Sequence, residues 1–224
     1  MTLNANKVPF SGGSRAEPLE PGNYPARVVQ VLDLGLQAQR PYEGQEKAPA
    51  YEIMVTYELG TEFMVDDDGN PDETRPRWVS ERFALYPLAS DRAKSTNRYK
   101  VLDPKIKYEG DWSQLIGAPC LVAVVNNKNK HTGKVYNNVG GISAPIKGMD
   151  VPELVNEGVT FDLSTGDTKT FKALPEWIQE LIKSNLEFKG SAFESALIKA
   201  NGHNEEPDDI DSDPVEIDDD DVPF

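Results

Sequence analysis

Cysteine and histidine are almost absent from this sequence of 224 residues, which contains one cysteine, Cys120, and two histidines, His131 and His203. A single thiol excludes an internal disulfide framework and a Cys-rich zinc site, and two imidazoles are too few for a His-built metal centre. The remaining chemistry is that of carboxylates, amines and aromatic rings. We therefore expect neither a metal nor another cofactor.

Long apolar runs are missing as well. No stretch approaches the roughly 20 residues that a membrane-spanning helix needs. Residues 1–10 also lack the basic start and apolar core of a signal peptide. The expectation is a soluble protein of a reducing cytoplasm, with no membrane partner.

The formal net charge of −15 argues at first against nucleic acid, because the field of the whole protein would repel a polyanion. Its distribution changes that conclusion. Residues 203–224 contain 11 acids and no Lys or Arg, so that residues 1–202 hold 27 acids against 23 bases. The charge is mostly that of a C-terminal tail.

The rest of the charge is segregated too. Residues 43–73 contain ten acids and one base, whereas residues 75–147 contain thirteen bases and five acids, a net charge of +8. Aromatic residues are set among these bases. Cations attract phosphates and flat rings stack on unpaired bases, so this pattern favours binding of a single strand. A solvated basic face over an aromatic core is the alternative.

Alternating and apolar runs predict five strands. The first has a period that shifts midway, as in a bulged or bent strand. The third places Trp78, Ser80, Arg82 and Tyr86 on one face and Val79, Phe83 and Leu85 on the other. The predicted strands cover residues 24–36, 51–59, 77–86, 121–125 and 134–142.

The segments between and after these strands complete the layout. Residues 66–73 are expected to form a long exposed connection, and residues 91–107 a loop or loosely ordered arm. A short helix capped by Asp111 should end at Gly117, before the fourth strand. Further helices are expected at 174–183, with Trp177, Ile178, Leu181 and Ile182 on one stripe, and at 191–200.

This order predicts a mainly β fold, a five-stranded OB-fold barrel with a short helix between strands 3 and 4 and a C-terminal helix. A small β-sandwich would give a similar string of strands. We expect an irregular N-terminal lead-in over 1–23, the OB-fold domain with its helical extension over 24–200, and a disordered acidic tail over 201–224, which has too few apolar residues to fold alone.

The most specific motif is Asp219-Asp220-Asp221-Val222-Pro223-Phe224. It resembles the acidic tip of bacterial single-stranded DNA-binding proteins, in which aspartates precede Ile-Pro-Phe. The layout of the body resembles that of the single-stranded DNA-binding proteins of tailed bacteriophages, whose OB-fold carries an inserted helix, a C-terminal helix and an acidic tail. Segments such as Leu115-Ile116-Gly117-Ala118-Pro119-Cys120 and Val135-Tyr136-Asn137-Asn138-Val139 are typical of phage replication proteins.

The resemblance implies binding of single-stranded DNA without strong sequence preference during phage DNA replication, recombination and repair, in the cytoplasm of the infected host. The tail would compete for the DNA groove and, once displaced, dock replication partners such as a polymerase, a helicase, a primase or a nuclease. The tip carries that docking role, in Asp218, Asp219, Asp220, Asp221, Val222, Pro223 and Phe224. A tail that reaches the groove of a second subunit would also form a homodimer.

The candidate DNA-binding residues combine rings for stacking with cations for phosphates. They are Trp78, Arg82, Tyr86, Arg92, Lys94, Arg98, Tyr99, Lys100, Lys105, Lys107, Lys128, Lys130, Lys134 and Tyr136. No phosphate loop, dinucleotide-binding glycine pattern, HExxH or nucleophile elbow is present, so we expect no catalysis. The other alternative is a non-catalytic interaction or virion protein with a β-sandwich body and a solubilising tail.

Overall fold

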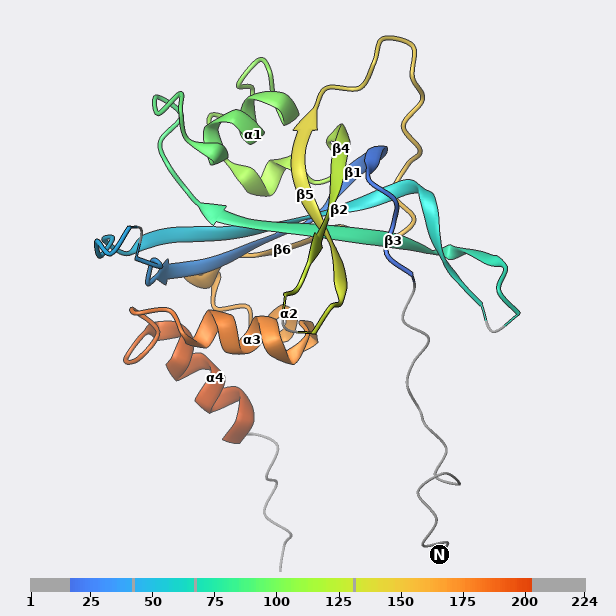
Figure 1. Ribbon diagram of the computed structural model, residues 1–224. Helices are drawn as coiled ribbons and strands as arrows, with labels where there is room; N and C mark the ends of the chain where they lie inside the picture. Colours follow the sequence, from blue (N-terminus) through green and yellow to red (C-terminus); the bar gives the residue numbers. More distant parts are fainter. Residues whose placement is uncertain (1–16, 42, 67, 131, 203–224) are drawn as a thin grey trace, which may run out of the picture.

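The computed structural model describes residues 17–41, 43–66, 68–130 and 132–202 (Figure 1). This part of the chain is mainly β, with short helices after the third strand and at its C-terminal end. The elements are β1 (Gly22–Gln37), β2 (Ala50–Val65), β3 (Pro71–Ala84), α1 (Lys94–Leu102), η2 (Trp112–Leu115), β4 (Pro119–Lys128), β5 (Val135–Ser143), β6 (Val159–Phe161), η3 (Leu163–Thr165), α2 (Thr168–Ala173), α3 (Glu176–Lys183) and α4 (Ala192–Gly202).

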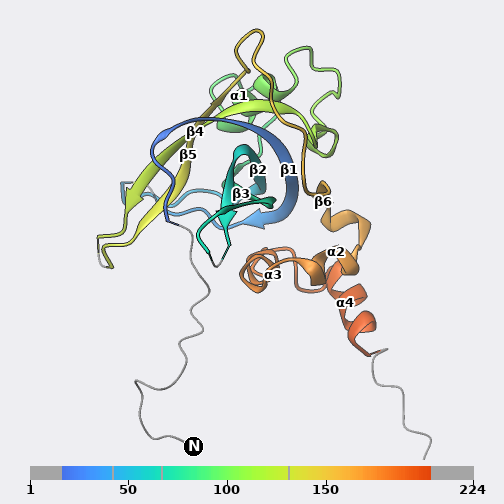
Figure 2. The ribbon, with the colours of Figure 1, turned by 90° about the vertical axis from the view of Figure 1, so that its right-hand side faces the viewer.

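Five of the strands form a curled antiparallel half-barrel. Their order in the sheet is β3-β2-β1-β4-β5, and β6 joins β1 in parallel. The pairing of β1 with β2 shifts register between Val28 and Gln30 and again between Asp33 and Gly35, which confirms the predicted bend of the first strand. Figure 2 shows β1 arching over the sheet, and the curl lets one strand pair with β2, β4 and β6.

A first core fills the inside of this curl and is closed by α1 and η2. The ring of Trp112 lies between Phe83 and Tyr99, with centroid separations of 5.6 and 5.4 Å. Tyr99 is completely buried. Its place among the residues predicted to contact DNA is therefore wrong: a ring without exposed surface cannot stack on a base.

A second core lies on the opposite face of the sheet. Leu32, Leu34 and Met54 project outward from β1 and β2 and pack under the C-terminal helices, where Ile178 and Ile182 of α3 are buried. The predicted helices over 174–183 and 191–200 are confirmed as α3 and α4. Trp177, predicted on the apolar stripe, is 58% exposed instead, because the helix turns Ile178 and Ile182 toward the sheet.

Residues 91–107 were expected to form a loop or loosely ordered arm. That prediction is wrong, because this segment contains helix α1. The buried side of this helix is partly polar. Ser95 Oγ accepts a hydrogen bond from the backbone N–H of Tyr86 at 3.0 Å, and Thr96 Oγ1 donates to the Pro87 carbonyl at 3.2 Å. Polar residues on the buried face conceal the apolar period that would reveal the helix.

The predicted long connection over 66–73 is also wrong, since β2 continues to Val65 and β3 begins at Pro71, its pairing partner. Asp66 closes the turn by accepting the backbone N–H of Asn70 at 2.8 Å. The sequence did not predict the short elements β6, η3 and α2.

Among the described residues, no helix combines the length and apolarity needed to cross a membrane.

Candidate nucleic-acid interface

The outer face of β3 carries the exposed aromatic and basic side chains of the predicted interface. Val79, Glu81 and Phe83 point into the barrel, while Trp78 and Arg82 point outward, as the alternation predicts. The side chain of Trp78 is 43% exposed. A ring that stands on a rigid strand and keeps this much surface is available for stacking.

Glu58 holds the Trp78 ring in place. The two residues are direct partners across β2 and β3, and the indole Nε1–H donates to Glu58 Oε2 at 3.1 Å. The same buried carboxylate accepts the backbone N–H of Val155 at 2.6 Å and the side-chain amide of Asn156 at 2.6 Å. Because several hydrogen-bond donors offset the negative charge of Glu58, this carboxylate orients the Trp78 ring without placing an unpaired anion beside it.

Arg27 of β1 is the cross-strand partner of Glu58 and anchors the other end of the same segment. Its guanidinium donates to the carbonyls of Val151 at 2.9 Å and Pro152 at 2.8 Å, and pairs with Glu153 at 2.6 Å. Residues 151–156 therefore lie across β1 and β2 and cover that part of the sheet. The outer face of β3 stays exposed next to this cover.

Arg82 is the second outward-facing residue of β3. Its Nε lies 2.5 Å from Glu52 Oε2, and Gln39 donates to the other oxygen of Glu52 at 2.8 Å. Glu52 is buried while the Arg82 side chain is 40% exposed. The pair therefore fixes the stem of Arg82 at the sheet surface with part of its side chain in solvent.

The β4–β5 hairpin supplies lysines as predicted. Lys128 ends β4, Lys130 lies in the turn and Lys134 precedes β5, and all three are exposed. Within the described parts of the chain none of them forms an ion pair. Tyr136, directly after them, is also exposed. Figure 2 shows the hairpin projecting from the side of the sheet opposite to the C-terminal helices.

The cations of α1 are placed differently from the prediction. Arg98 donates to both oxygens of Glu81, at 2.8 and 3.2 Å, while Lys94 lies 2.8 Å from Oε2 and the Tyr57 hydroxyl donates at 2.9 Å. Arg98 also comes close to β5, since its Nη1 lies 4.0 Å from where a Cβ on Gly141 would be. The Arg98 side chain is only 13% exposed, so it joins α1 to the wall of the barrel instead of facing solvent.

The other cations of this region lie at the surface. Lys100 pairs with Asp91 at 2.7 Å, and Lys107 lies over the ring of Tyr108, 4.6 Å from its centroid. Arg92 and Lys105 are exposed. These side chains form a basic fringe around α1, separate from the hairpin lysines in the sequence and held by a different element.

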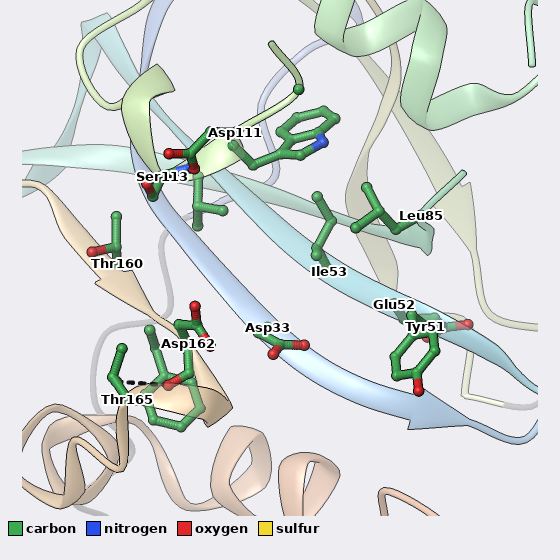
Figure 3. A pocket seen from close by; sticks show the side chains of 14 residues that line it. Asp33, Tyr51, Glu52, Ile53, Leu85, Asp111, Ser113, Thr160, Asp162 and Thr165 are labelled. Carbon is green, nitrogen blue, oxygen red and sulfur yellow. Dashed lines mark hydrogen bonds between the residues drawn. The ribbon is translucent and has the colours of Figure 1, made fainter. Parts of the chain in front are cut away.

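Tyr86, exposed just beyond β3, lines a hollow together with Tyr51 and Leu85. Tyr51 and Leu85 also line a neighbouring cavity that the sequence did not reveal (Figure 3). This cavity, about 490 Å³ in volume, is lined by Asp33, Glu52, Asp111 and Asp162 together with apolar residues of β1, β2 and η2. Burial raises the pKa of Asp33. A lining rich in carboxylates disfavours phosphate, so this cavity does not extend the basic surface.

The carboxylates of the cavity come from separate strands and turns, which is why spacing along the chain could not group them. The described parts of the chain contain no cluster of three or more His, Cys, Asp or Glu side chains arranged to hold a metal ion. The predicted tail residues Asp218–Phe224 lie outside the described residues, as does the lead-in up to residue 16. No protein-family model matches the chain, and no curated protein matches it either.

Proposed function

We propose that the protein binds single-stranded DNA without strong sequence preference, on the outer face of β3 and along the β4–β5 hairpin. The observation that carries the proposal is Trp78, a partly exposed ring held by Glu58 on a rigid strand, with Arg82 on the same face. Stacking platforms next to cations bind single strands regardless of sequence, because every base has a flat face and every nucleotide a phosphate.

The fold is part of the same proposal. An OB-fold is a five-stranded, partly open Greek-key barrel, and it commonly holds oligonucleotides. The strand order β3-β2-β1-β4-β5, with helix α1 between β3 and β4, supports assigning this half-barrel to the OB-fold. The C-terminal helices and residues 151–156 are then additions that cover the outer face of β1 and β2.

The proposed role of each residue depends on how exposed its side chain is. Trp78, Tyr86 and Tyr136 stack on bases, Arg82 and the hairpin lysines contact phosphates, and the exposed cations near α1 lengthen the path. Arg98 is given a structural role because Glu81 already engages it on both oxygens. The proposed activity needs no cofactor and no catalysis.

The acidic segment over 203–224 completes the proposal as a competitor. It holds 11 acids and no Lys or Arg, whereas the interface is basic. A tethered segment acts at an effective concentration on the order of millimolar, so even a weak contact is occupied much of the time. DNA displaces it, and the displaced segment docks replication proteins. Deleting Asp208–Phe224 should then tighten DNA binding; unchanged or weaker binding would refute the competition.

The test of binding is a titration of the full chain with fluorescent oligo-dT and with duplex DNA at two salt concentrations. Trp78→Ala should weaken oligo-dT binding about tenfold or more, since stacking contributes about 1–3 kcal/mol per base. Trp177→Ala is the matched control, because it removes another exposed tryptophan from α3. Binding that is absent, or equally affected by the two changes, contradicts the proposal.

The runner-up function is a non-catalytic interaction or virion protein. Exposed apolar side chains in the C-terminal helical region, at Trp177 of α3, Ile198 of α4 and Leu186 between these helices, favour a protein-binding surface there. In that case oligo-dT would not bind at either salt concentration. Loss of labelled single strand in the presence of Mg²⁺ would instead reveal a nuclease.

A further inference from the structure

A small cavity lies among the three C-terminal helices, away from the proposed DNA interface. It measures about 230 Å³, enough for an aromatic side chain, and its apolar lining comes from Phe171, Phe188, Leu197 and Ile198. Lys172 and Lys183, whose side chains are exposed, also line it, together with Gln179, Glu194 and Asn201. The cavity is therefore apolar at its base with two cations at its mouth.

The polar side chains of the lining are positioned by the helices themselves. Lys172 Nζ donates to the carbonyl of Ala200 at 3.1 Å, joining α2 to the end of α4, and Lys183 Nζ lies 5.8 Å from the centroid of the Phe171 ring. Glu194, the one acid of the lining, accepts the backbone N–H of Gly190 at 2.6 Å. Its charge is thus directed partly toward a backbone donor.

Ile198 is the unusual member of the lining. It is a large aliphatic side chain, yet it is 66% exposed on α4. Exposed apolar surface that borders a concave site is characteristic of a binding surface that lacks its partner. The ligand that fits this lining has an aromatic or aliphatic end and adjacent negative charge.

The chain itself contains such a segment, and it begins at this cavity. Asn201 lines the cavity and α4 ends at Gly202, so that residues 203–224 continue from its edge. This segment contains Asp218-Asp219-Asp220-Asp221-Val222-Pro223-Phe224, four carboxylates followed by three apolar residues. Its chemistry is complementary to the cavity: a ring for the apolar base and carboxylates for the two lysines.

We propose that Val222-Pro223-Phe224 docks in the cavity between α2, α3 and α4 of its own chain, with Phe224 in the apolar base and aspartates 218–221 facing Lys172 and Lys183. A tether of about 20 residues provides an effective concentration on the order of millimolar, so a contact with a Kd near 1 mM is about half occupied. The docked tip is masked from other proteins, and a partner must compete with the cavity to engage it.

This contact is independent of DNA, because it uses neither β3 nor the β4–β5 hairpin. The failure of one proposal therefore leaves the other standing. If both are correct, the acidic residues between 203 and 217 remain available to the basic surface while the tip occupies the helices. Displacement from the DNA surface and release of the tip are then two separate steps.

The test uses the full chain with a nitroxide spin label on a cysteine introduced by Ile217→Cys. Cys120 does not compete for the label, since it is buried and burial raises the pKa of its thiol to about 12. When the effective concentration of the tip is near the Kd of its contact with the cavity, the contact is about half occupied. In ¹⁵N spectra, we therefore expect amides of α2, α3 and α4 around the cavity to lose about half of their intensity or more. The amides of residues 68–70, in the β2–β3 turn at the end of the sheet away from these helices (Figure 1), should keep theirs.

Two variants should each restore the lost intensity: Phe224→Ala, and the double charge reversal Lys172→Glu/Lys183→Glu. The matched control is Lys169→Glu/Lys189→Glu, which reverses two exposed lysines of the same helical region that do not line the cavity. Ile198→Asp is a third test, since its exposed side chain can be changed without disturbing the core. Unaltered amide shifts in the barrel show that each variant is folded.

Contact within one chain is distinguished from contact between two copies by a mixed sample. In that sample the ¹⁴N chain carries the spin label and the ¹⁵N chain, which is the one observed, carries none. Intensity loss in the fully labelled chain and not in the mixture supports the proposal. Loss that appears equally in the mixture, no loss around the cavity, or equal behaviour of test and control charge reversals would overturn it.

Discussion

Arg98 is the residue whose role differs most clearly between the sequence, which suggests phosphate binding, and the structure, which indicates a stabilising contact. By sequence it belongs to a basic arm that tracks phosphates. In the fold its guanidinium holds Glu81, whose side chain is 4% exposed, through two hydrogen bonds of 2.8 and 3.2 Å. Lys94 and Tyr57 are the other partners of that carboxylate. The residue therefore tests stability and DNA binding separately.

Arg98→Ala should lower the free energy of unfolding by about 3–5 kcal/mol, because it leaves a buried carboxylate without its principal counter-ion. The remaining contacts of Lys94 and Tyr57 place the result toward the lower end. Lys100→Ala removes an exposed pair with Asp91 and should cost less than about 1 kcal/mol. Urea titration followed by tryptophan fluorescence measures both, through a midpoint shift at constant slope.

The double variant Arg98→Ala/Glu81→Gln should recover part of the loss, since the uncompensated charge is then gone. DNA binding by folded Arg98→Ala should keep the salt dependence of the unmodified protein. A stability loss no larger than that of Lys100→Ala, or a salt slope reduced by about one, would refute the structural role and return Arg98 to the phosphate path.

Three further outcomes are expected. Burial raises the pKa of Asp33, so the native state retains a proton that the unfolded state releases near pH 4; unfolding free energy should fall as pH rises through that window, and less so in Asp33→Asn. Cys120, with a pKa raised to about 12, should react with a thiol reagent only as fast as the protein opens, so that a fast native reaction contradicts its burial. Gly35 has φ +71°, and a Cβ there would clash with Asn185 Nδ2, so Gly35→Ala should cost about 1–3 kcal/mol in thermal or urea unfolding.

Asn185 explains the size of the expected effect at Gly35. Its side-chain oxygen accepts the backbone N–H of Leu36 at 2.9 Å, which fastens the end of α3 to β1. The added methyl group would strain the backbone and displace this contact. Asn185→Ala, which removes the contact without the strain, provides the comparison.

Alternation along a strand was sufficient to predict the C-terminal part of β3 and its two faces, although the strand spans Pro71–Ala84 rather than the predicted 77–86. Val79 and Phe83 point inward and Trp78 and Arg82 outward, because successive side chains of a strand project to opposite sides. The bend of β1 could be predicted from its shift of period, and the cap at Asp111 from its residue type, since Asp111 Oδ1 accepts the N–H of Ser113 at 2.9 Å. These are local rules, and they operate within a few residues.

Contacts between distant segments decided the rest. Tyr99 and Tyr86 are both tyrosines in a basic stretch, yet one is fully buried against Trp112 and the other is half-exposed. Helix α1 was hidden because its buried face includes Ser95 and Thr96, whose partners lie at Tyr86 and Pro87. No local pattern encodes a neighbour that lies beyond the next turn of chain.

The scarcity of cysteine and histidine and the segregation of charge are properties of the sequence alone, and they direct attention to carboxylates, amines and rings. Which of those groups face solvent was settled only by tertiary structure. Residues 151–156, held by Arg27 and Glu58, cover β1 and β2, and Glu81 engages Arg98 inside the barrel wall. A charged side chain is available to a binding surface only when packing leaves part of it in solvent, as for Arg82, and does not bury it against its partner, as for Arg98.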